Sequence, residues 1–317
     1  MDNQIKKSEI LFLYETSYNI PNGDPFTGEQ RYDEETKKIL VSDVRIKRFI
    51  RTYLEETLKK SIYVSDKTGA GKTDSKNVLK WLAEHQPEGI NTTDIGEVLK
   101  QQIDVRLFGG ISTLDDKPKF KIDGQDKEFT NGHVQFTGPV QFAQLNPSLN
   151  EVNLRMHQNT THFTSNENNT QGSIGTTTLV PYSIMQIHGW INPKVAEETG
   201  LTKDDLKNMY EGIWFGSSGE GSSFSRSKVG QNSVLLLEII YKEANKKIYG
   251  VDRLISITPN EGKKGESIRS MDDYVFNFEK LLALQDDDRI EKINYYTEIP
   301  EIENQVNGKN KFSKMKI

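Results

Sequence analysis

The fold of this chain is decided first by residues 9–25, whose sequence is Glu9-Ile10-Leu11-Phe12-Leu13-Tyr14-Glu15-Thr16, then Ser17-Tyr18, then Asn19-Ile20-Pro21-Asn22-Gly23-Asp24-Pro25. The first eight residues are apolar and rich in aromatic side chains, which predicts a β-strand. The last seven are dense in turn-forming residues, so the strand is expected to run into a structured loop.

A helix is predicted to follow from Ser42, a residue type that caps helix N-termini, with Asp43 in the first turn. At about 100° per residue, one side of this helix is apolar and the other is basic. The apolar side holds Ile46, Phe49, Ile50 and Tyr53, and the basic side holds Lys47, Arg48 and Arg51.

Three further strands and a second helix complete the core. Residues 132–143 alternate as a strand does, with a Gly-Pro break, and residues 180–191 and 234–241 are apolar strands. A second helix is expected from Thr202, whose capping-box partner is Asp205. The order strand, helix, strand, strand, helix, strand predicts an α+β, ferredoxin-like fold. This is also the order of the RNA-recognition fold, whose four-stranded sheet has an open face.

Three insertions decorate this core: residues 60–131, which contain expected helices at 77–84 and 94–102, residues 144–179, and the tail after 243. Residues 157–178 consist largely of Asn, Thr, Ser and Gly, so they are expected to form an exposed excursion. The chain is therefore expected to be one composite domain, divided at 1–59, 60–131, 132–143, 144–179, 180–250 and 251–317.

Composition excludes several classes of protein. The chain has 317 residues, 27% of them charged, and no cysteine, which rules out a disulfide scaffold, a thiolate metal site and a cysteine nucleophile. No apolar run is long enough to span a bilayer, and the first residues lead into a strand rather than a signal peptide. We expect a soluble, cytoplasmic protein without a membrane partner.

The net charge is −5, but the acid is concentrated near the C-terminus. Residues 271–303 hold ten acidic and three basic side chains, so the rest of the chain is net positive. A basic face that binds nucleic acid is therefore compatible with the overall charge, whereas the acidic segment is expected to face a partner subunit rather than RNA.

Four basic residues fall within seven positions of the first helix: Arg45, Lys47, Arg48 and Arg51. Lysine and arginine in such a cluster grip phosphates electrostatically without reading sequence. A merely solvated helix face is the competing explanation. Arg226 and Lys228, after a Gly/Ser loop, are further candidate phosphate contacts.

Two enzymatic or nucleotide-binding alternatives stay open. Residues 68–73 end like a phosphate-binding loop, but Asp66 stands where its first glycine belongs, which favours a surface loop. Asp24 or Asp33 could hold Mg²⁺ in a metal-dependent ribonuclease, although turn formation explains Asp24 more simply. The five histidines have no metal-ligand spacing, so we predict no metal and no cofactor.

Several motifs together resemble one family. They are residues 18–25, Arg31-Tyr32-Asp33 and Val41-Ser42-Asp43-Val44-Arg45-Ile46-Lys47-Arg48, with further matches at residues 104–109, 138–141 and 225–228. The pattern resembles the crRNA-binding backbone subunits of type I Cascade effectors of CRISPR systems, in the I-B and I-C branch of the RAMP superfamily. The resemblance covers most of the chain to about residue 250.

This resemblance implies a modified RNA-recognition fold shaped like a hand, with a palm, a finger at 60–131 and a thumb at 144–179. Several copies would stack along one crRNA and expose its bases for pairing with target DNA, together with the large subunit and the guide-end-capping subunit of Cascade. Each thumb would displace a base at regular intervals.

The resemblance also implies which residues contact RNA. Asn22 and Gly23 would approach it through their backbone, while Arg45, Lys47, Arg48 and Arg51 would line its path. Leu154, Arg155 and Met156, at the base of the thumb, would act as wedge and phosphate residues, and Arg226 and Lys228 would add contacts. No nuclease activity is implied, and the loop aspartate of the type III relatives has no match here. The central strands also lack an aromatic RNA-binding motif.

Overall fold

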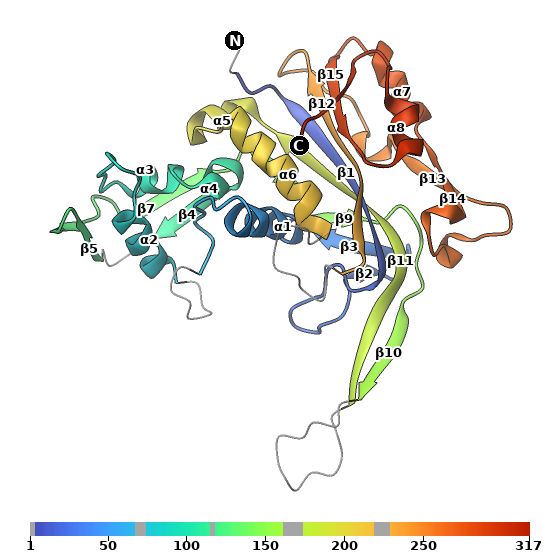
Figure 1. The fold of residues 1–317 in the computed structure, drawn as a ribbon, viewed down its shortest axis with the longest axis horizontal. Helices are drawn as coiled ribbons and strands as arrows, with labels where there is room; N and C mark the ends of the chain where they lie inside the picture. Colours follow the sequence, from blue (N-terminus) through green and yellow to red (C-terminus); the bar gives the residue numbers. More distant parts are fainter. Residues whose placement is uncertain (1–3, 67–73, 115–117, 161–173, 219–228) are drawn as a thin grey trace, which may run out of the picture.

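The structure is a computed structural model that describes residues 4–66, 74–114, 118–160, 174–218 and 229–317. It is a mixed α/β fold around one central sheet (Figure 1). The strand order in that sheet is β10-β11-β1-β12-β15-β16, and β8 also pairs with β11. These strands are β1 (Ser8–Asn19), β8 (Val140–Phe142), β10 (Arg155–Thr160), β11 (Ile174–Ile191), β12 (Gln231–Tyr241), β15 (Ile290–Tyr296) and β16 (Phe312–Lys314).

One face of the sheet is covered by α1 (Asp43–Glu56) and α6 (Lys203–Ser218), which lie side by side in Figure 1. Phe12 and Tyr14 of β1 point into this core, where they meet Phe49 of α1 and Trp214 of α6. The two helices approach closely because α6 carries Gly216: a Cβ there would lie 2.6 Å from the carbonyl oxygen of Phe49.

The second face of the sheet is buried as well, unlike the open face of the RNA-recognition fold that has the same order of elements. Leu11, Leu13, Leu235 and Leu237 point into a second core, which residues from the C-terminal part of the chain, such as Leu281, complete. Strands buried on both sides contain continuous apolar runs, as residues 234–237 of β12 do, and that pattern argues against an open face. Residues 251–317 also supply β15 and β16 to the central sheet, so they are part of the fold rather than a tail.

The segment 132–143 is two strands, not one. β7 (His133–Thr137) pairs with β4 (Gly109–Thr113), whereas β8 pairs with β11. The Gly138-Pro139 break separates them, and Gly138 passes so close to Phe108 that a Cβ would lie 2.0 Å from its carbonyl carbon. This crossing is where residues 60–131 leave the central body.

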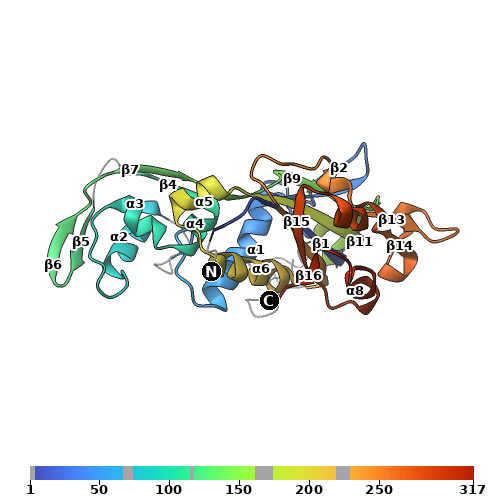
Figure 2. The same cartoon turned by 90° about the horizontal axis from the view of Figure 1, so that it is seen from above.

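That inserted region has its own small core and lies to one side of the sheet in Figures 1 and 2. Its elements are α2 (Ser75–Glu84), α3 (Ile95–Lys100), α4 (Ile103–Phe108), β4, β5 (Lys119–Ile122), β6 (Gln125–Glu128) and β7. The predicted helix over 94–102 is confirmed at its Asp94 cap but ends at Lys100, and α4 follows it directly.

The remaining elements flank the sheet. They are β2 (Tyr32–Asp33), β3 (Lys38–Ser42), β9 (Leu145–Pro147), α5 (Pro193–Thr199), β13 (Ser256–Pro259), β14 (Tyr274–Asn277), α7 (Glu279–Leu282) and α8 (Pro300–Val306), with short 3₁₀ turns at Val251–Arg253, Gly265–Ser267, Met271–Asp273 and Ala283–Asp286. In the described part of the chain, no helix has both the length and the apolar character needed to cross a membrane.

Candidate nucleic-acid interface

The loop between β1 and β3 is tied to the start of α1. The side-chain oxygen of Asn22 accepts a hydrogen bond from the backbone N–H of Ser42 at 2.7 Å, and the N–H of Asn22 donates to the Gln30 side chain. Ser42 takes the N-cap position, as predicted, but its side chain makes no capping bond. Asn22 is therefore buried and structural through its side chain, whereas Gly23 next to it is exposed.

The four basic residues of α1 divide into two pairs. Lys47 and Arg51 face the inserted region, where both lie over the Phe108 ring. Arg51 donates to the carboxylate of Asp104 at 3.0 Å, and Asp104 is only 1% exposed in its side chain. Lys47 pairs with Asp43 at 3.1 Å. These two side chains thus already have carboxylate partners within the protein.

Arg45 and Arg48 lie one turn apart, on the side of α1 that faces the loop. The Arg45 guanidinium lies 4.6 Å from the centre of the Phe49 ring. Burial lowers the pKa of Arg45, and the neighbouring charge of Arg48 lowers it further, although Tyr14 opposes this. Arg48 is exposed and forms no ion pair within the described residues. An anion between the two guanidinium groups would offset their mutual repulsion.

Two adjoining hollows lie beside this helix. The first, here named the thumb-base pocket, has a volume of 680 Å³, and among its lining residues are Tyr18, Asn22, Gly23, Arg45, His157 and Leu179. The second, here named the loop pocket, has a volume of 650 Å³, and among its lining residues are Asn22, Gly23, Arg31, Arg45, Arg48 and Leu145. Since Asn22, Gly23 and Arg45 line both, the two pockets adjoin, and together they are here named the recess.

The hairpin of β10 and β11 rises from this recess and points away from the body of the molecule (Figure 1). Met156 is 77% exposed, and Leu154 packs against the main core. Because side chains alternate along a strand, Arg155 projects to the same face as His157, which lines the thumb-base pocket, and Met156 projects to the opposite face.

The other predicted site residues fall elsewhere. Arg226 and Lys228 lie outside the described residues, as do residues 67–73 of the loop that ends like a phosphate-binding motif. Asp24 forms an ion pair with Arg31 at 3.1 Å and accepts a hydrogen bond from the N–H of Phe26. Asp33 accepts from the Thr36 hydroxyl at 2.6 Å, which lowers its pKa. Within the described residues, no group of three or more His, Asp or Glu side chains could hold a metal ion.

Tyr18 is a residue of the recess that sequence reasoning missed. It is 66% exposed and has φ = +45°, a backbone conformation that non-glycine residues rarely adopt. The next residue, Asn19, holds this bend by donating from its side chain to the Val229 carbonyl. In the sequence, Tyr18 begins the motif at residues 18–25, but it also follows a strand, where an aromatic residue is more often buried.

Comparisons with known proteins agree on one family. The family model described as CRISPR-associated protein Cas7 matches residues 6–279. The CRISPR-associated protein Cas7 of Haloferax volcanii is 28% identical over 288 residues, which cover 88% of this chain and 82% of that protein.

Two solved structures are similar in fold. A chain of a CRISPR RNA-guided surveillance complex in a pre-nicking state aligns with a TM-score of 0.51 at 14% identity, covering 98% of this chain and 96% of that one. A chain of another CRISPR RNA-guided surveillance complex aligns with a TM-score of 0.50 at 13% identity, covering 93% and 90%. With a family model that spans most of its length, the chain belongs to the Cas7 family of CRISPR-associated proteins.

Proposed function

We propose that this protein is a crRNA-binding backbone subunit of a type I Cascade complex and has no catalytic step of its own. Several copies bind along one guide RNA in the cytoplasm, next to the large subunit and the guide-end-capping subunit, and leave the guide bases free to pair with target DNA. Sequence reading is thereby left to the guide, and the protein supplies phosphate contacts and packing between subunits.

The observation that carries this proposal is the recess formed by two adjoining pockets between α1 and the base of the β10–β11 hairpin, in a chain of the Cas7 family. Arg45 and Arg48 supply positive charge to it, and Gly23 allows close approach of a ligand to the backbone. Arg155 adds charge from the hairpin. A single-stranded guide that enters the recess would meet cations on two sides.

The same proposal assigns the central sheet and its two helices to the palm of the hand-shaped fold. The strands β8, β11, β1 and β12 lie in that order, and α1 and α6 cover one face. The order of β1, α1, β8, β11, α6 and β12 along the chain supports a ferredoxin-like arrangement of these elements. On this interpretation residues 60–131 are the finger and the β10–β11 hairpin belongs to the thumb, whose exposed Met156 acts as the wedge that displaces a base.

No observation favours the ribonuclease alternative. Asp24 and Asp33 are each engaged in a local turn, and neither lies in a carboxylate cluster among the described residues.

The test is light scattering of the purified protein with and without a crRNA-like single strand, at two salt concentrations, with the RNA checked for cuts. We expect salt-sensitive growth into particles that contain several copies and intact RNA. RNA cutting that needs Mg²⁺ and disappears in Asp24→Ala would overturn the proposal in favour of an enzyme. Absence of RNA binding at low salt, even with the Cascade partner subunits present, would also overturn it.

Arg48→Ala sharpens this test. Because Arg48 is exposed and makes no ion pair among the described residues, the fold should stay intact. RNA affinity should fall, and the slope of log K against log salt should decrease by about 0.7, as expected for one lost phosphate contact on a single strand. Lys47→Ala, which removes the cation already paired with Asp43, is the matched control and should change the slope less.

A further inference from the structure

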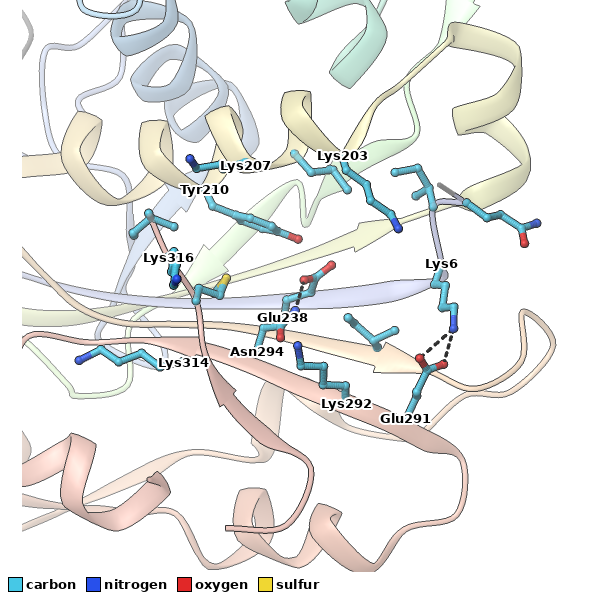
Figure 3. Close-up of a pocket in the computed structure, with 16 residues that line it drawn as sticks. Lys6, Lys203, Lys207, Tyr210, Glu238, Glu291, Lys292, Asn294, Lys314 and Lys316 are labelled. Carbon is cyan, nitrogen blue, oxygen red and sulfur yellow. Dashed lines mark hydrogen bonds and ion pairs between the residues drawn. The ribbon is translucent and has the colours of Figure 1, made fainter. Parts of the chain in front are cut away.

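A second pocket lies far from the recess. Here named the lysine pocket, it has a volume of 540 Å³ between α6, the residues before β1 and the C-terminal strands β15 and β16 (Figure 3). Gln4, Ile5 and Lys6 line it at one end of β1, whereas Ser17, Tyr18 and Asn19 line the thumb-base pocket at the other end. At about 3.3 Å per residue the two are separated by roughly 35 Å, so the lysine pocket is not part of the proposed guide path.

The rim of this pocket is strongly basic. Six lysines from separate parts of the chain surround it, against two glutamates: Lys6, Lys203, Lys207, Lys292, Lys314 and Lys316, with Glu238 and Glu291. Lys6 pairs with Glu291 at 2.8 Å, and Lys314 pairs with Glu303 outside the pocket. Lys292 and Lys316 form no ion pair within the described residues. The rim therefore has positive charge in excess of its own carboxylates.

The floor of the lysine pocket is largely apolar. Ile5, Leu206 and Ile240 contribute aliphatic surface. Glu238 at the floor is satisfied, since it accepts from Ser8 and Asn294.

Tyr210 of α6 also lines the pocket. It is buried and points toward the pocket (Figure 3). Its hydroxyl lies beside the Glu238 carboxylate and is itself buried.

An apolar floor under a basic rim fits a peptide better than a nucleic acid. Nucleic-acid sites combine a positive groove with exposed aromatic rings on which bases stack. The ring that lines this pocket, Tyr210, is buried, and the apolar floor would find no partner in a phosphate backbone. A peptide that carries an apolar side chain between carboxylates matches both layers, with the anchor on the floor and the acids on the rim.

The acidic patch that adjoins this pocket in a second copy of the chain is the less suitable occupant. Its exposed acids Asp286 and Asp288 immediately precede β15, whose Glu291 and Lys292 line the same pocket. Because this acidic patch and the lysine pocket adjoin, each copy would place its acids in the pocket of the other through a twofold contact. Such a contact closes a dimer and does not extend an array. This step rests on the proposed function, in which copies form an array.

From these observations we propose that the lysine pocket is a docking site for an acidic, leucine-anchored peptide segment of another protein. The occupant places an apolar side chain on Leu206 and Ile240, and its carboxylates pair with Lys292, Lys316 and their neighbours.

The test uses the full-length protein and fluorescence anisotropy with a labelled peptide in which two leucines are flanked by glutamates and aspartates. We expect binding that weakens with salt and falls at least tenfold in the double variant Lys292→Glu/Lys316→Glu. The control is Lys121→Glu/Lys127→Glu, which makes the same charge change on exposed residues of β5 and β6 and should leave binding unchanged. A peptide with serine in place of leucine should bind at least fivefold more weakly.

Three outcomes would overturn the proposal. The first is equal peptide binding by the Lys292→Glu/Lys316→Glu variant and the wild type. The second is a charge-matched single-stranded DNA that binds more tightly than the peptide and depends on the same two lysines. The third is self-association that the same variant abolishes, which would assign the pocket to a second copy. RNA binding, measured in parallel, should be unchanged in this variant, so failure of this proposal is separable from failure of the proposed function.

Discussion

At the scale of single residues, Arg51 shows how a motif can be basic without being a binding site. It reaches the buried carboxylate of Asp104, whose oxygens also accept hydrogen bonds from the N–H groups of Tyr63 and Val64. One ionic contact therefore joins α1 to the inserted region. The replacement of Lys47, Arg48 and Arg51 together would change stability and RNA binding at once, so single variants are needed.

Arg51→Ala should lower the free energy of unfolding by roughly 3 kcal/mol, because it leaves the Asp104 carboxylate buried without its counter-charge. Chemical denaturation monitored by tryptophan fluorescence measures this. Arg48→Ala provides the comparison and should change stability by less than about 0.5 kcal/mol, as for other exposed sites. Equal effects of the two variants would contradict the assignment of Arg51 to the fold.

For Tyr18 we predict that one substitution raises stability and weakens RNA binding. Tyr18→Gly should raise the free energy of unfolding by about 0.5 kcal/mol, since glycine adopts positive φ without the steric cost that an L side chain carries, less its own entropy cost.

The same change should weaken RNA binding at least fivefold if the exposed ring stacks on a base, which contributes about 1–3 kcal/mol. Thermal unfolding and RNA titration are the two measurements. Tyr18→Phe keeps the ring and should bind like the wild type. RNA affinity that is unchanged in Tyr18→Gly would remove the ring from the interface.

At the scale of elements, two glycines allow the inserted region to join the central body. Gly109 has φ = +78°, and a Cβ there would lie 2.3 Å from the carbonyl oxygen of Phe136. Together with Gly138, it lets the backbone of the α4–β4 junction cross that of β7 and β8 in contact. The matched motifs at residues 104–109 and 138–141 thus build the root of the inserted region.

Gly138→Ala should therefore destabilise this root by about 3 kcal/mol, because backbone atoms would have to move to admit the methyl group. Limited proteolysis should cut first within residues 74–137, and the unfolding transition should shift to lower temperature. Gly265→Ala, where the nearest atoms lie at 3.4 Å, is a matched substitution that should have little effect. Wild-type protease resistance in Gly138→Ala would show that the crossing is looser than described.

The helix α6 is positioned by Asp205, for which the sequence predicted the capping role but not the contact with Arg106. Its capping box is confirmed: the N–H of Thr202 donates to Asp205, and the N–H of Asp205 donates to the Thr202 hydroxyl. Asp205 also accepts two hydrogen bonds from the Arg106 guanidinium. The same carboxylate thus caps α6 and fixes α4 against it.

At the scale of the whole molecule, the C-terminal part decides whether the sheet has a free face. Its acidic composition suggested a separate segment, yet many of its apolar residues are buried in the second core. Leu281 is fully buried, and Ile293 lies in the central sheet. Charge at the surface and apolar side chains beneath it are what a covering layer requires.

Leu281→Ala should accordingly cost about 2–4 kcal/mol, the usual cost of removing a buried leucine side chain. Val275→Ala, in the same part of the chain but at a residue that is 62% exposed, should cost less than about 0.5 kcal/mol. Urea denaturation compares the two. An unchanged free energy of unfolding in Leu281→Ala would mean that this part of the chain contributes little to the stability of the fold.

Local signals were sufficient for the elements of the core. The start of α1 at Ser42, the capping box of α6 and the strands around residues 9–16, 180–191 and 234–241 depend on periodicity and capping within a few residues, and the structure confirms them. The motifs around residues 18–25 and 41–48 were likewise sufficient to place the chain in its family.

What the sequence by itself determined is thus the kind and order of the core elements and the family, because both depend on short-range pattern. Only the tertiary structure decided which basic side chains of α1 remain available, that Tyr18 is exposed, and that the second face of the sheet is covered. These outcomes depend on contacts between residues far apart in the chain, such as Arg51 with Asp104 and Leu11 with the C-terminal core. A cation and its buried partner 53 positions away leave no trace in local periodicity, so no reading of either segment alone could have paired them.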